Sequence, residues 1–380
     1  MNLAILGATG SIGLQTLDIV RASEGRFSVV TVTAHTSVDK LRAIIDEFHP
    51  SYVAVGLESA MRDLQRDYPD VTFGYGSNGL VTAATAGPTD TLVVNAIVGS
   101  AGLEPTIHAI KAGRNVALAN KETLVIGGEL IMPLLDEHDV RLLPIDSEHS
   151  AIMQLLDGAK HDTVRRIVIT ASGGSFRDKK RSELTTVTVG DALAHPNWTM
   201  GAKITIDSAT MMNKGLEIIE AHHLFDLPYD QIDTVLHRES IVHSLVEFTD
   251  TALLAHLGEP DMRVPISYAL HYPERVPFDG TRLQLETLGA LHFEPLDETR
   301  YPMLRYAREA GVKGGYAPTV LNAANEAAVQ LFLSGKITFL QIEEIVLQCV
   351  TTFQPEGPLT LPGILEVDNK VKDYVLKAYS

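Results

Sequence analysis

A glycine-rich segment directly after an apolar run at the N-terminus constrains the fold most. Residues 2–6 read Asn-Leu-Ala-Ile-Leu, a strand pattern, and Gly7-Ala8-Thr9-Gly10-Ser11-Ile12-Gly13 leads into a helical pattern over residues 12–22. Such glycines let the backbone turn tightly and approach a pyrophosphate, while the helix N-terminus offers free N–H groups and a positive dipole end. A tight turn without a ligand is the plainer alternative. Strand, glycines and helix together favour dinucleotide binding.

The first 150 residues alternate short β-branched runs with helix-compatible segments. Strand patterns occupy residues 2–6, 27–34, 52–55, 91–95, 115–119 and 141–144, and helical patterns include residues 12–22, 39–49 and 104–112. This alternation is typical of a doubly wound parallel sheet. Residues 1–150 are therefore predicted to form a Rossmann-like, dinucleotide-binding domain of the α/β class.

The pattern changes twice after residue 150. Strands are predicted at residues 165–170, 233–237 and 241–248 and a helix at 209–224, without a crossover helix between every pair of strands. A catalytic α+β domain is expected over residues 151–285, with a flap near 195–203. A proline-dotted stretch leads through a linker at 286–300 to a small C-terminal helical domain, 301–380. Its helical patterns lie at residues 301–310, 317–334, 339–350 and 367–379.

Composition excludes several classes of function. A formal net charge of -17 disfavours nucleic acid and anionic membranes as partners. The chain lacks an uninterrupted run of eighteen apolar residues and begins directly with a strand pattern, which predicts a cytoplasmic protein. The single cysteine, Cys349, rules out an internal disulfide, and its apolar neighbours predict a core thiol and not a nucleophile. Tyr-x-x-x-Lys is absent, which disfavours the tyrosine-acid mechanism of short-chain reductases.

The end of the second predicted strand indicates which nicotinamide cofactor binds. NAD-preferring domains usually place an acid there to bind the ribose 2′-hydroxyl. This chain has His35, Thr36 and Ser37, whose hydroxyls and imidazole can donate to a 2′-phosphate. NADP is favoured, although the arginine or lysine of a strong phosphate clamp is absent.

Two acidic clusters far apart in the chain resemble one metal and phosphate site. Asp146 and Glu148 flank Ser147, so in an extended segment their side chains would leave the same side of the backbone. On a helix, Asn213, Lys214 and Glu217 would share one face. The ordinary alternative is that these residues decorate solvent-exposed turns and helices.

Three further segments carry candidate ligand-binding residues. Ser172-Gly173-Gly174 follows a predicted strand, and Ser208 precedes the predicted helix that carries Lys214; serines, bare amides and an ammonium suit a phosphomonoester. Each serine alone would be an ordinary cap or turn residue. The segment from His195 to Gly201 contains the only tryptophan, Trp198, and fits an apolar flap that excludes water.

Asn120-Lys121-Glu122 follows the strand pattern at 115–119. The carboxyl ends of Rossmann strands face the cofactor crevice, so Lys121 could reach a substrate, and Asn120 or Glu122 the nicotinamide ribose. The alternative is that they are ordinary residues of a first helical turn.

With these motifs in place, the chain resembles the 1-deoxy-D-xylulose 5-phosphate reductoisomerases along essentially its whole length. The shared strings, in order, are Gly7 to Gly13, Asn120-Lys121-Glu122, Asp146-Ser147-Glu148-His149, Ser172-Gly173-Gly174, His195 to Gly201, Ser208 to Glu217 and Asn322-Ala323-Ala324-Asn325-Glu326. The resemblance implies rearrangement of 1-deoxy-D-xylulose 5-phosphate and reduction with NADPH to 2-C-methyl-D-erythritol 4-phosphate, in non-mevalonate isoprenoid synthesis. It also implies a homodimer.

The resemblance further implies a role for each matching residue. Asp146, Glu148 and Glu217 would bind Mg²⁺ or Mn²⁺. The substrate would contact Lys121, Ser147, Glu148, Ser172, His195, Trp198, Ser208, Asn213, Lys214 and Glu217, of which Lys121, His195 and the three metal ligands would be catalytic. Thr9, Gly10, Ser11, Ile12, Asn120, Glu122 and Gly201 would line the cofactor, with His35, Thr36 and Ser37 where relatives often have glycine, a basic residue and asparagine. The competing classes are another NADP oxidoreductase acting on a phosphosugar and a nucleotide-sensing Rossmann protein.

Overall fold

The computed structural model describes residues 1–379, which divide into two compact units. Unit 1 comprises Met1–Thr123, Ile131–Ser150 and Met262–Asp279. Unit 2 comprises Leu124–Leu130, Ala151–Asp261 and residues 280–379. Among the described residues, no helix is long and apolar enough to cross a membrane.

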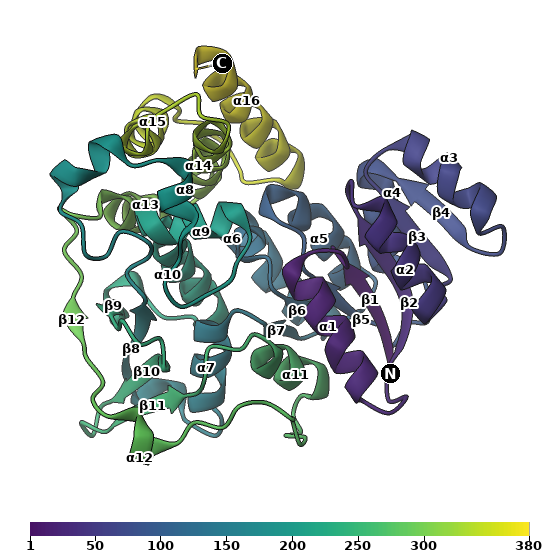
Figure 1. Cartoon of the computed structure of the whole chain (residues 1–380), viewed down its shortest axis with the longest axis horizontal. Helices are drawn as coiled ribbons and strands as arrows, with labels where there is room; N and C mark the ends of the chain where they lie inside the picture. The colour runs from purple at the N-terminus through teal and green to yellow at the C-terminus, as the bar shows by residue number, and fades with distance from the viewer. Residues whose placement is uncertain (380) are drawn as a thin grey trace. The chain divides into compact units, whose positions relative to one another are not determined.

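Unit 1 is built on a seven-stranded parallel sheet in the order β4-β3-β2-β1-β5-β6-β7 (Figure 1). Its strands are β1 (Asn2–Leu6), β2 (Ser28–Ala34), β3 (Tyr52–Val55), β4 (Thr72–Tyr75), β5 (Leu92–Asn95), β6 (Val116–Leu118) and β7 (Leu142–Pro144). Strands β2 to β4 are added on one side of β1 and strands β5 to β7 on the other, so the strand order reverses between β1 and β5. In open α/β sheets, a ligand crevice forms at the carboxyl ends of the strands at such a reversal.

Helices connect the strands of unit 1. They are α1 (Ser11–Ala22), α2 (Val38–Phe48), α3 (Glu58–Asp67), α4 (Gly76–Thr85), α5 (Leu103–Lys111), both ends of α6 (Lys121–His138) and the beginning of α7 (Ser147–Leu155), with α11 (Arg263–His271) added from later in the chain. Strands β3 and β5 are buried along their whole length, as expected for a parallel sheet covered on both faces. That burial explains why β3 and the first three residues of β5 are continuous apolar runs.

Unit 2 contains a five-stranded mixed sheet in the order β11-β10-β8-β9-β12. Its strands are β8 (Val164–Ala171), β9 (Ile232–Leu236), β10 (Val242–Phe248), β11 (Leu253–Leu257) and β12 (Glu294–Pro295). Only β8 and β9 run parallel to each other; β10 pairs antiparallel with both β8 and β11. A cluster of buried apolar residues, including Ile167, Ile218 and Leu304, joins this sheet to the helices above it.

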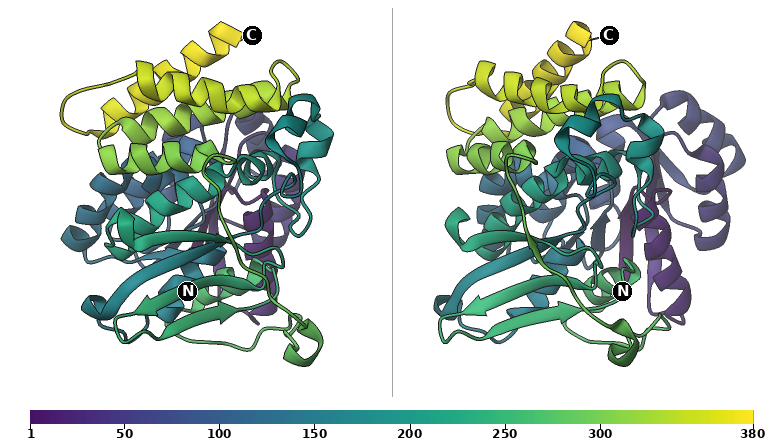
Figure 2. Two further views of the ribbon diagram at one scale, coloured as in Figure 1. Left: turned by 90° about the vertical axis from the view of Figure 1, so that its left-hand side faces the viewer. Right: turned by 60° about the vertical axis from the view of Figure 1, so that its left-hand side comes forward.

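Most helices of unit 2 form successive layers over the sheet, with α10 next to the strands and the C-terminal helices beyond it (Figure 2). They are α8 (Val189–Leu193), α9 (Ala202–Thr210), α10 (Met212–Phe225), α12 (Leu285–Leu288), α13 (Pro302–Lys313), α14 (Ala317–Leu333), α15 (Phe339–Thr352) and α16 (Leu361–Tyr379). Cys349 is buried on α15, where burial raises the pKa of its thiol to about 11, and the prediction of a core thiol is confirmed.

The predicted fold class is confirmed: a parallel sheet of the Rossmann type, a second α+β part and C-terminal helices. Three details differ. The predicted helix at 209–224 is two helices, because Met211 adopts a left-handed conformation (φ 64°) between α9 and α10. Ser208 therefore lies inside α9, four residues before α10, the helix that carries Lys214. The sequence patterns also missed α3, β4 and α4. The domain boundaries at residues 150, 285 and 300 stay predictions.

Candidate active site

The glycine-rich turn between β1 and α1 has the shape that a phosphate-binding turn requires. Gly7 has a φ of 85°, and a Cβ there would lie 2.6 Å from the Ala96 carbonyl oxygen. A Cβ on Gly13 would lie 2.3 Å from the Gly7 carbonyl oxygen. Only glycine fits either position. The first N–H groups of α1, which begins at Ser11, have no intrahelical acceptor, and because no side chain caps this end they can bind an anion.

The residues predicted to select the cofactor lie immediately after β2. His35, Thr36 and Ser37 are all exposed, and Ser37 is the N-cap position of α2. A Cβ on Gly56 would collide with the His35 ring, so this glycine leaves the imidazole its room. Lys40, an exposed residue in the first turns of α2, is a cation in the same segment that sequence reasoning did not single out.

The N-terminus of α6 is formed by Asn120, Lys121 and Glu122, which agrees with the alternative that they are residues of a first helical turn. All three are nevertheless buried. The Asn120 side chain accepts a hydrogen bond from the Thr123 N–H and donates to the carbonyl oxygens of Ile97 (2.7 Å) and Gly99 (2.9 Å). Asn120 therefore shapes the loop after β5. Buried charges on its two neighbours are unusual for ordinary first-turn residues.

The acidic turn at residues 146–149 differs from the sequence expectation. Asp146 and Glu148 were expected on one side of an extended segment; instead β7 ends at Pro144 and α7 begins at Ser147. Strand alternation is thus the wrong reason for their proximity, because a helical turn brings one carboxylate oxygen of each within 4.8 Å. The Ser147 hydroxyl donates to Glu148 (2.5 Å).

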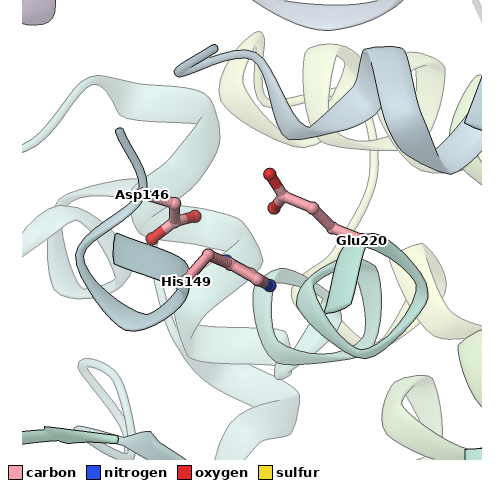
Figure 3. A group of neighbouring side chains, drawn as sticks. All are labelled: Asp146, His149 and Glu220. Atoms are coloured by element: carbon pink, nitrogen blue, oxygen red, sulfur yellow. The ribbon is translucent and has the colours of Figure 1, made fainter. Parts of the chain in front are cut away.

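Asp146 is held as an anion by its neighbours in unit 1. Burial alone would raise the pKa of its carboxyl, but the positive charge of Lys121, which forms an ion pair with it, holds the pKa well below its ordinary value. Figure 3 shows Asp146 just before α7 and the fully buried His149 on its first turn. The acidic turn therefore offers hard anionic oxygen ligands, beside one imidazole.

The predicted polar face of α10 is confirmed in unit 2. Asn213 donates to Glu217 (2.5 Å), and Lys214 forms an ion pair with the same carboxylate. Both side chains of this ion pair are buried, with Glu217 only 1% exposed. Glu220, also drawn in Figure 3, lies one turn further along α10 and is equally buried. A buried carboxylate needs such charged and polar partners to stay ionised.

The loop after β8 packs directly against α9. Gly174 has a φ of 69°, and a Cβ there would lie 2.6 Å from the Ser208 carbonyl oxygen and 2.7 Å from Ala209 Cα. This close approach fixes the phosphate loop, Ser172–Gly174, on the part of α9 that carries Ser208. The Ser172 hydroxyl also contacts His195 Nε2 at 3.0 Å. Unit 2 thus joins the predicted phosphate residues Ser172 and Ser208 with the flap.

The flap, residues 195–203, is organised around His195. Its Nδ1 atom accepts hydrogen bonds from the backbone N–H groups of Asn197 (3.2 Å) and Trp198 (2.9 Å). A neutral ring must therefore carry its proton on Nε2, which donates to Ser172. Burial, and to a lesser degree the charge of Arg177, lowers the pKa of His195 to about 4. The half-buried Trp198 ring lies 6.5 Å from the ring of His243.

Two residues that support this region were missed by sequence reasoning. Asn197 donates to the Arg238 carbonyl oxygen (2.6 Å) and to the Ser240 hydroxyl (2.8 Å), which anchors the flap to the loop after β9. Arg177 donates to the carbonyl oxygens of Ser172 (3.3 Å) and Arg238 (3.0 Å). The sequence signal that could have identified Asn197 is its place inside the flap motif. For Arg177 the only such signal is that it lies five residues after Ser172 in the sequence.

Each unit therefore gathers part of the predicted residues. Unit 1 holds the cofactor turn, His35 to Ser37, Lys121 and the acidic turn. Unit 2 holds the phosphate loop, the flap, Ser208 and the polar face of α10. The first set suits a dinucleotide and a hard cation, and the second suits a phosphate.

Comparison with known proteins identifies the family. The family model described as 1-deoxy-D-xylulose 5-phosphate reductoisomerase matches residues 3–128. Two models of the C-terminal domains of these reductoisomerases match residues 142–225 and 257–374. The 1-deoxy-D-xylulose 5-phosphate reductoisomerase of Lysinibacillus sphaericus is 53% identical over 99% of this chain and 98% of its own length. That of Bacillus subtilis is also 53% identical, over 98% of both chains.

Solved structures agree with these matches. A crystal structure of DOX-P reductoisomerase in complex with NADPH, fosmidomycin and magnesium is 42% identical, with a TM-score of 0.94 over 99% of this chain and 98% of that chain. The Zymomonas mobilis enzyme in complex with NADPH is 41% identical, with a TM-score of 0.91 over 100% and 99% of the two chains. The chain belongs to the 1-deoxy-D-xylulose 5-phosphate reductoisomerase family.

Proposed function

We propose that this protein isomerises 1-deoxy-D-xylulose 5-phosphate and reduces the product with NADPH to 2-C-methyl-D-erythritol 4-phosphate, a step of non-mevalonate isoprenoid synthesis. The observation that carries the proposal is 53% identity to a reductoisomerase over 99% of the chain. The related structures that contain NADPH and magnesium support the same two cofactors here.

Asp146, Glu148 and Glu217 are the proposed ligands of one Mg²⁺ or Mn²⁺ ion. Their oxygens are the donors that hard divalent cations prefer. Two of the three proposed ligands already form an ion pair, Asp146 with Lys121 and Glu217 with Lys214, as expected where anionic side chains are buried. A bound divalent ion would supply Lewis acidity toward substrate oxygens and make a coordinated hydroxyl more acidic.

The phosphate of the substrate is proposed to bind Ser172, Ser208, Asn213 and Lys214. Hydroxyls, a side-chain amide and an ammonium donate to phosphate oxygens, and the charged donor is the strongest of them. Lys214 is buried, so its charge is poorly screened by water. His195 stays neutral and can present its Nε2 proton to the substrate, while Trp198 and the rest of the flap exclude water.

NADPH is proposed to lie on the cofactor turn. The pyrophosphate would meet Thr9, Gly10, Ser11 and Ile12, where the free helix N–H groups lie, and the 2′-phosphate would meet His35, Thr36 and Ser37. Glu122, Asn120 and Gly201 would line the nicotinamide side. Bound NADPH would supply the hydride, and Lys121 would contact the substrate near it.

Assembly as a homodimer is a further part of the proposal, supported by the edge strand β11. This strand ends the five-stranded sheet, and its leucines Leu253, Leu254 and Leu257 are exposed. An open edge without lysine or proline to guard it favours pairing with another strand. A second copy of β11 related by a two-fold axis would satisfy both edges at once. The cytoplasmic location stays a prediction.

The loss of NADPH absorbance on addition of 1-deoxy-D-xylulose 5-phosphate and Mg²⁺ tests the proposal most directly. We expect oxidation that requires both additions and ceases with a chelator. Oxidation with another phosphosugar but not with this substrate would favour a different NADP oxidoreductase. Binding of NADPH without any turnover would favour the nucleotide-sensing class and refute the proposed reaction.

A further inference from the structure

A buried carboxylate on α9 has no role in the proposed chemistry. Asp207 is 1% exposed and immediately precedes Ser208. It forms an ion pair with Lys203 (2.8 Å), four residues earlier on the same helix. Its second oxygen accepts a hydrogen bond from the side-chain amide of Asn325 on α14 (2.8 Å). A charge so deeply buried is costly unless every such partner is present.

The contact with Asn325 also gives a role to a sequence motif that the proposed function leaves unused. Of the string from Asn322 to Glu326, Asn322 donates to Glu326 within α14 itself (2.8 Å), whereas Asn325 reaches across to α9. Both asparagines are completely buried. Two matched polar residues on one helix therefore differ in that only the second is bonded to Asp207.

Helix α9 is consequently fixed on two sides. The phosphate loop presses on it at Ser208 and Ala209, where Gly174 permits backbone contact. Asn325 holds α9 through Asp207, the residue before Ser208. Lys203, the last residue of the flap, forms an ion pair with the same carboxylate. A shift of α9 would therefore move Ser208 relative to Ser172 and move the end of the flap.

We propose that Asp207, held by Asn325 and Lys203, is a positioning residue that sets Ser208 and the flap for binding of the substrate phosphate. The inference rests on the proposed function and adds a role for residues outside the binding site. Asp207 itself touches no substrate. Its effect is transmitted because it fixes the helix that carries Ser208.

The first test compares Asn325→Ala with Asn322→Ala. Each removes a buried amide from α14, so both should lower the melting temperature, but only Asn325→Ala removes a donor to Asp207. We expect Asn325→Ala to raise the KM for 1-deoxy-D-xylulose 5-phosphate about tenfold, equivalent to about 1.4 kcal/mol. The KM for NADPH should stay unchanged, and Asn322→Ala should change neither constant. Lys203→Met provides a second route to the same effect.

A swap of the two side chains isolates the hydrogen bond. Asn325→Asp alone places two carboxylates face to face and should be the most damaging single change. The double variant Asp207→Asn/Asn325→Asp allows residue 207 to accept from Lys203 and donate to residue 325, so it should recover most of the lost affinity. Non-additivity of this kind is the signature of a direct interaction.

Trp198 supplies a readout that does not depend on turnover, because it is the only tryptophan and lies in the flap. Titration with 1-deoxy-D-xylulose 5-phosphate and Mg²⁺ should change its emission, with a midpoint shifted about tenfold in Asn325→Ala and restored in the swap. Equal effects of Asn322→Ala and Asn325→Ala, or no recovery in the folded swap variant, would overturn the positioning role. An inactive wild-type protein would instead refute the proposed function.

Discussion

Single residues in the flap show how hydrogen bonding sets the charge of a side chain. Both ring nitrogens of His195 are engaged by protein, with Nδ1 accepting two backbone N–H groups. Protonation of Nδ1 would remove that acceptor and leave the flap backbone without its partner. The lowering of the His195 pKa to about 4 agrees with this geometry. His195 is therefore a neutral hydrogen-bond donor at neutral pH.

This ionisation predicts how stability depends on pH. Below its ordinary pKa of 6.5 the unfolded chain binds a proton at His195 that the folded chain does not bind until its pKa of about 4. The free energy of unfolding should consequently fall as the pH drops through that window. His223, whose pKa is lowered to about 4 by burial and then by His222, contributes in the same sense.

Urea-unfolding midpoints at about pH 7 and about pH 5 measure this loss. His195→Asn and His223→Asn should each reduce the difference between the two midpoints, and the double variant should reduce it most. If the double variant loses as much stability as the wild type between these two pH values, other titrating groups dominate the pH dependence in this range.

Glu217→Gln should reduce turnover strongly while the protein stays folded. The change removes one anionic oxygen ligand at the proposed metal site. At low Mg²⁺ we expect turnover to fall by about 100-fold or more, because even residues that only support a metal ligand change affinity by about 10- to 100-fold. Initial rates measured across a range of Mg²⁺ concentrations test this expectation.

Glu309→Gln is the matched control, since Glu309 is an exposed carboxylate on α13 with only a 3.8 Å contact to Arg305. It should leave the Mg²⁺ dependence unchanged. Glu148→Gln, which changes another proposed ligand on a different helix, should reproduce the Glu217→Gln defect. Normal turnover of Glu217→Gln at low Mg²⁺ would remove Glu217 from the ligand set.

Elements show where sequence patterns succeeded and where they could not. Hydrophobic periodicity predicted β1 and β3 at their observed bounds and α10 with its polar face of Asn213, Lys214 and Glu217. It could not predict the break between α9 and α10, because Met211 is a good helix former that tertiary packing holds at a positive φ. The helical start at Ser147 was hidden for a different reason, since residues 146–150 are all polar and show no apolar repeat.

Packing of α10 on α13 depends on Gly215. A Cβ at this position would lie 2.5 Å from the Ala307 side chain, so Gly215→Ala must push the two helices apart. Alanine favours a helix by about 1 kcal/mol over glycine, but overpacking in a core costs about 1–3 kcal/mol. We expect a net loss of stability and a higher KM for the phosphosugar, because Lys214 lies beside the displaced residue.

Gly190→Ala on α8 is the control, because Gly190 is exposed and a Cβ there meets only the Thr188 hydroxyl at 3.7 Å. It should leave the melting temperature unchanged or raise it. A Gly215→Ala protein as stable as the wild type would show that α10 and α13 can separate at little cost.

At the scale of the whole molecule, local sequence patterns predict the fold class, but they do not predict that a later segment of the chain packs back into unit 1. Alternating strands and helices were enough to predict the parallel sheet of unit 1. The contribution of Met262–Asp279 to that unit depends on contacts such as Phe27 with His271, whose rings lie 5.0 Å apart but whose positions are far apart in sequence. No periodicity within a segment encodes such a contact, and the same applies to Asp207 with Asn325.

Assembly is the last property that belongs to the whole molecule. If β11 pairs with its own copy, Leu254, which is 47% exposed in the single chain, becomes buried in the dimer. Leu254→Glu would then place a charge in that interface and should yield a monomer by sedimentation velocity. Leu285→Glu, at a leucine on α12 that is 68% exposed, should remain dimeric. A wild-type monomer would contradict the homodimer, whereas a dimeric Leu254→Glu variant would place the interface elsewhere, because a buried unpaired carboxylate costs several kcal/mol.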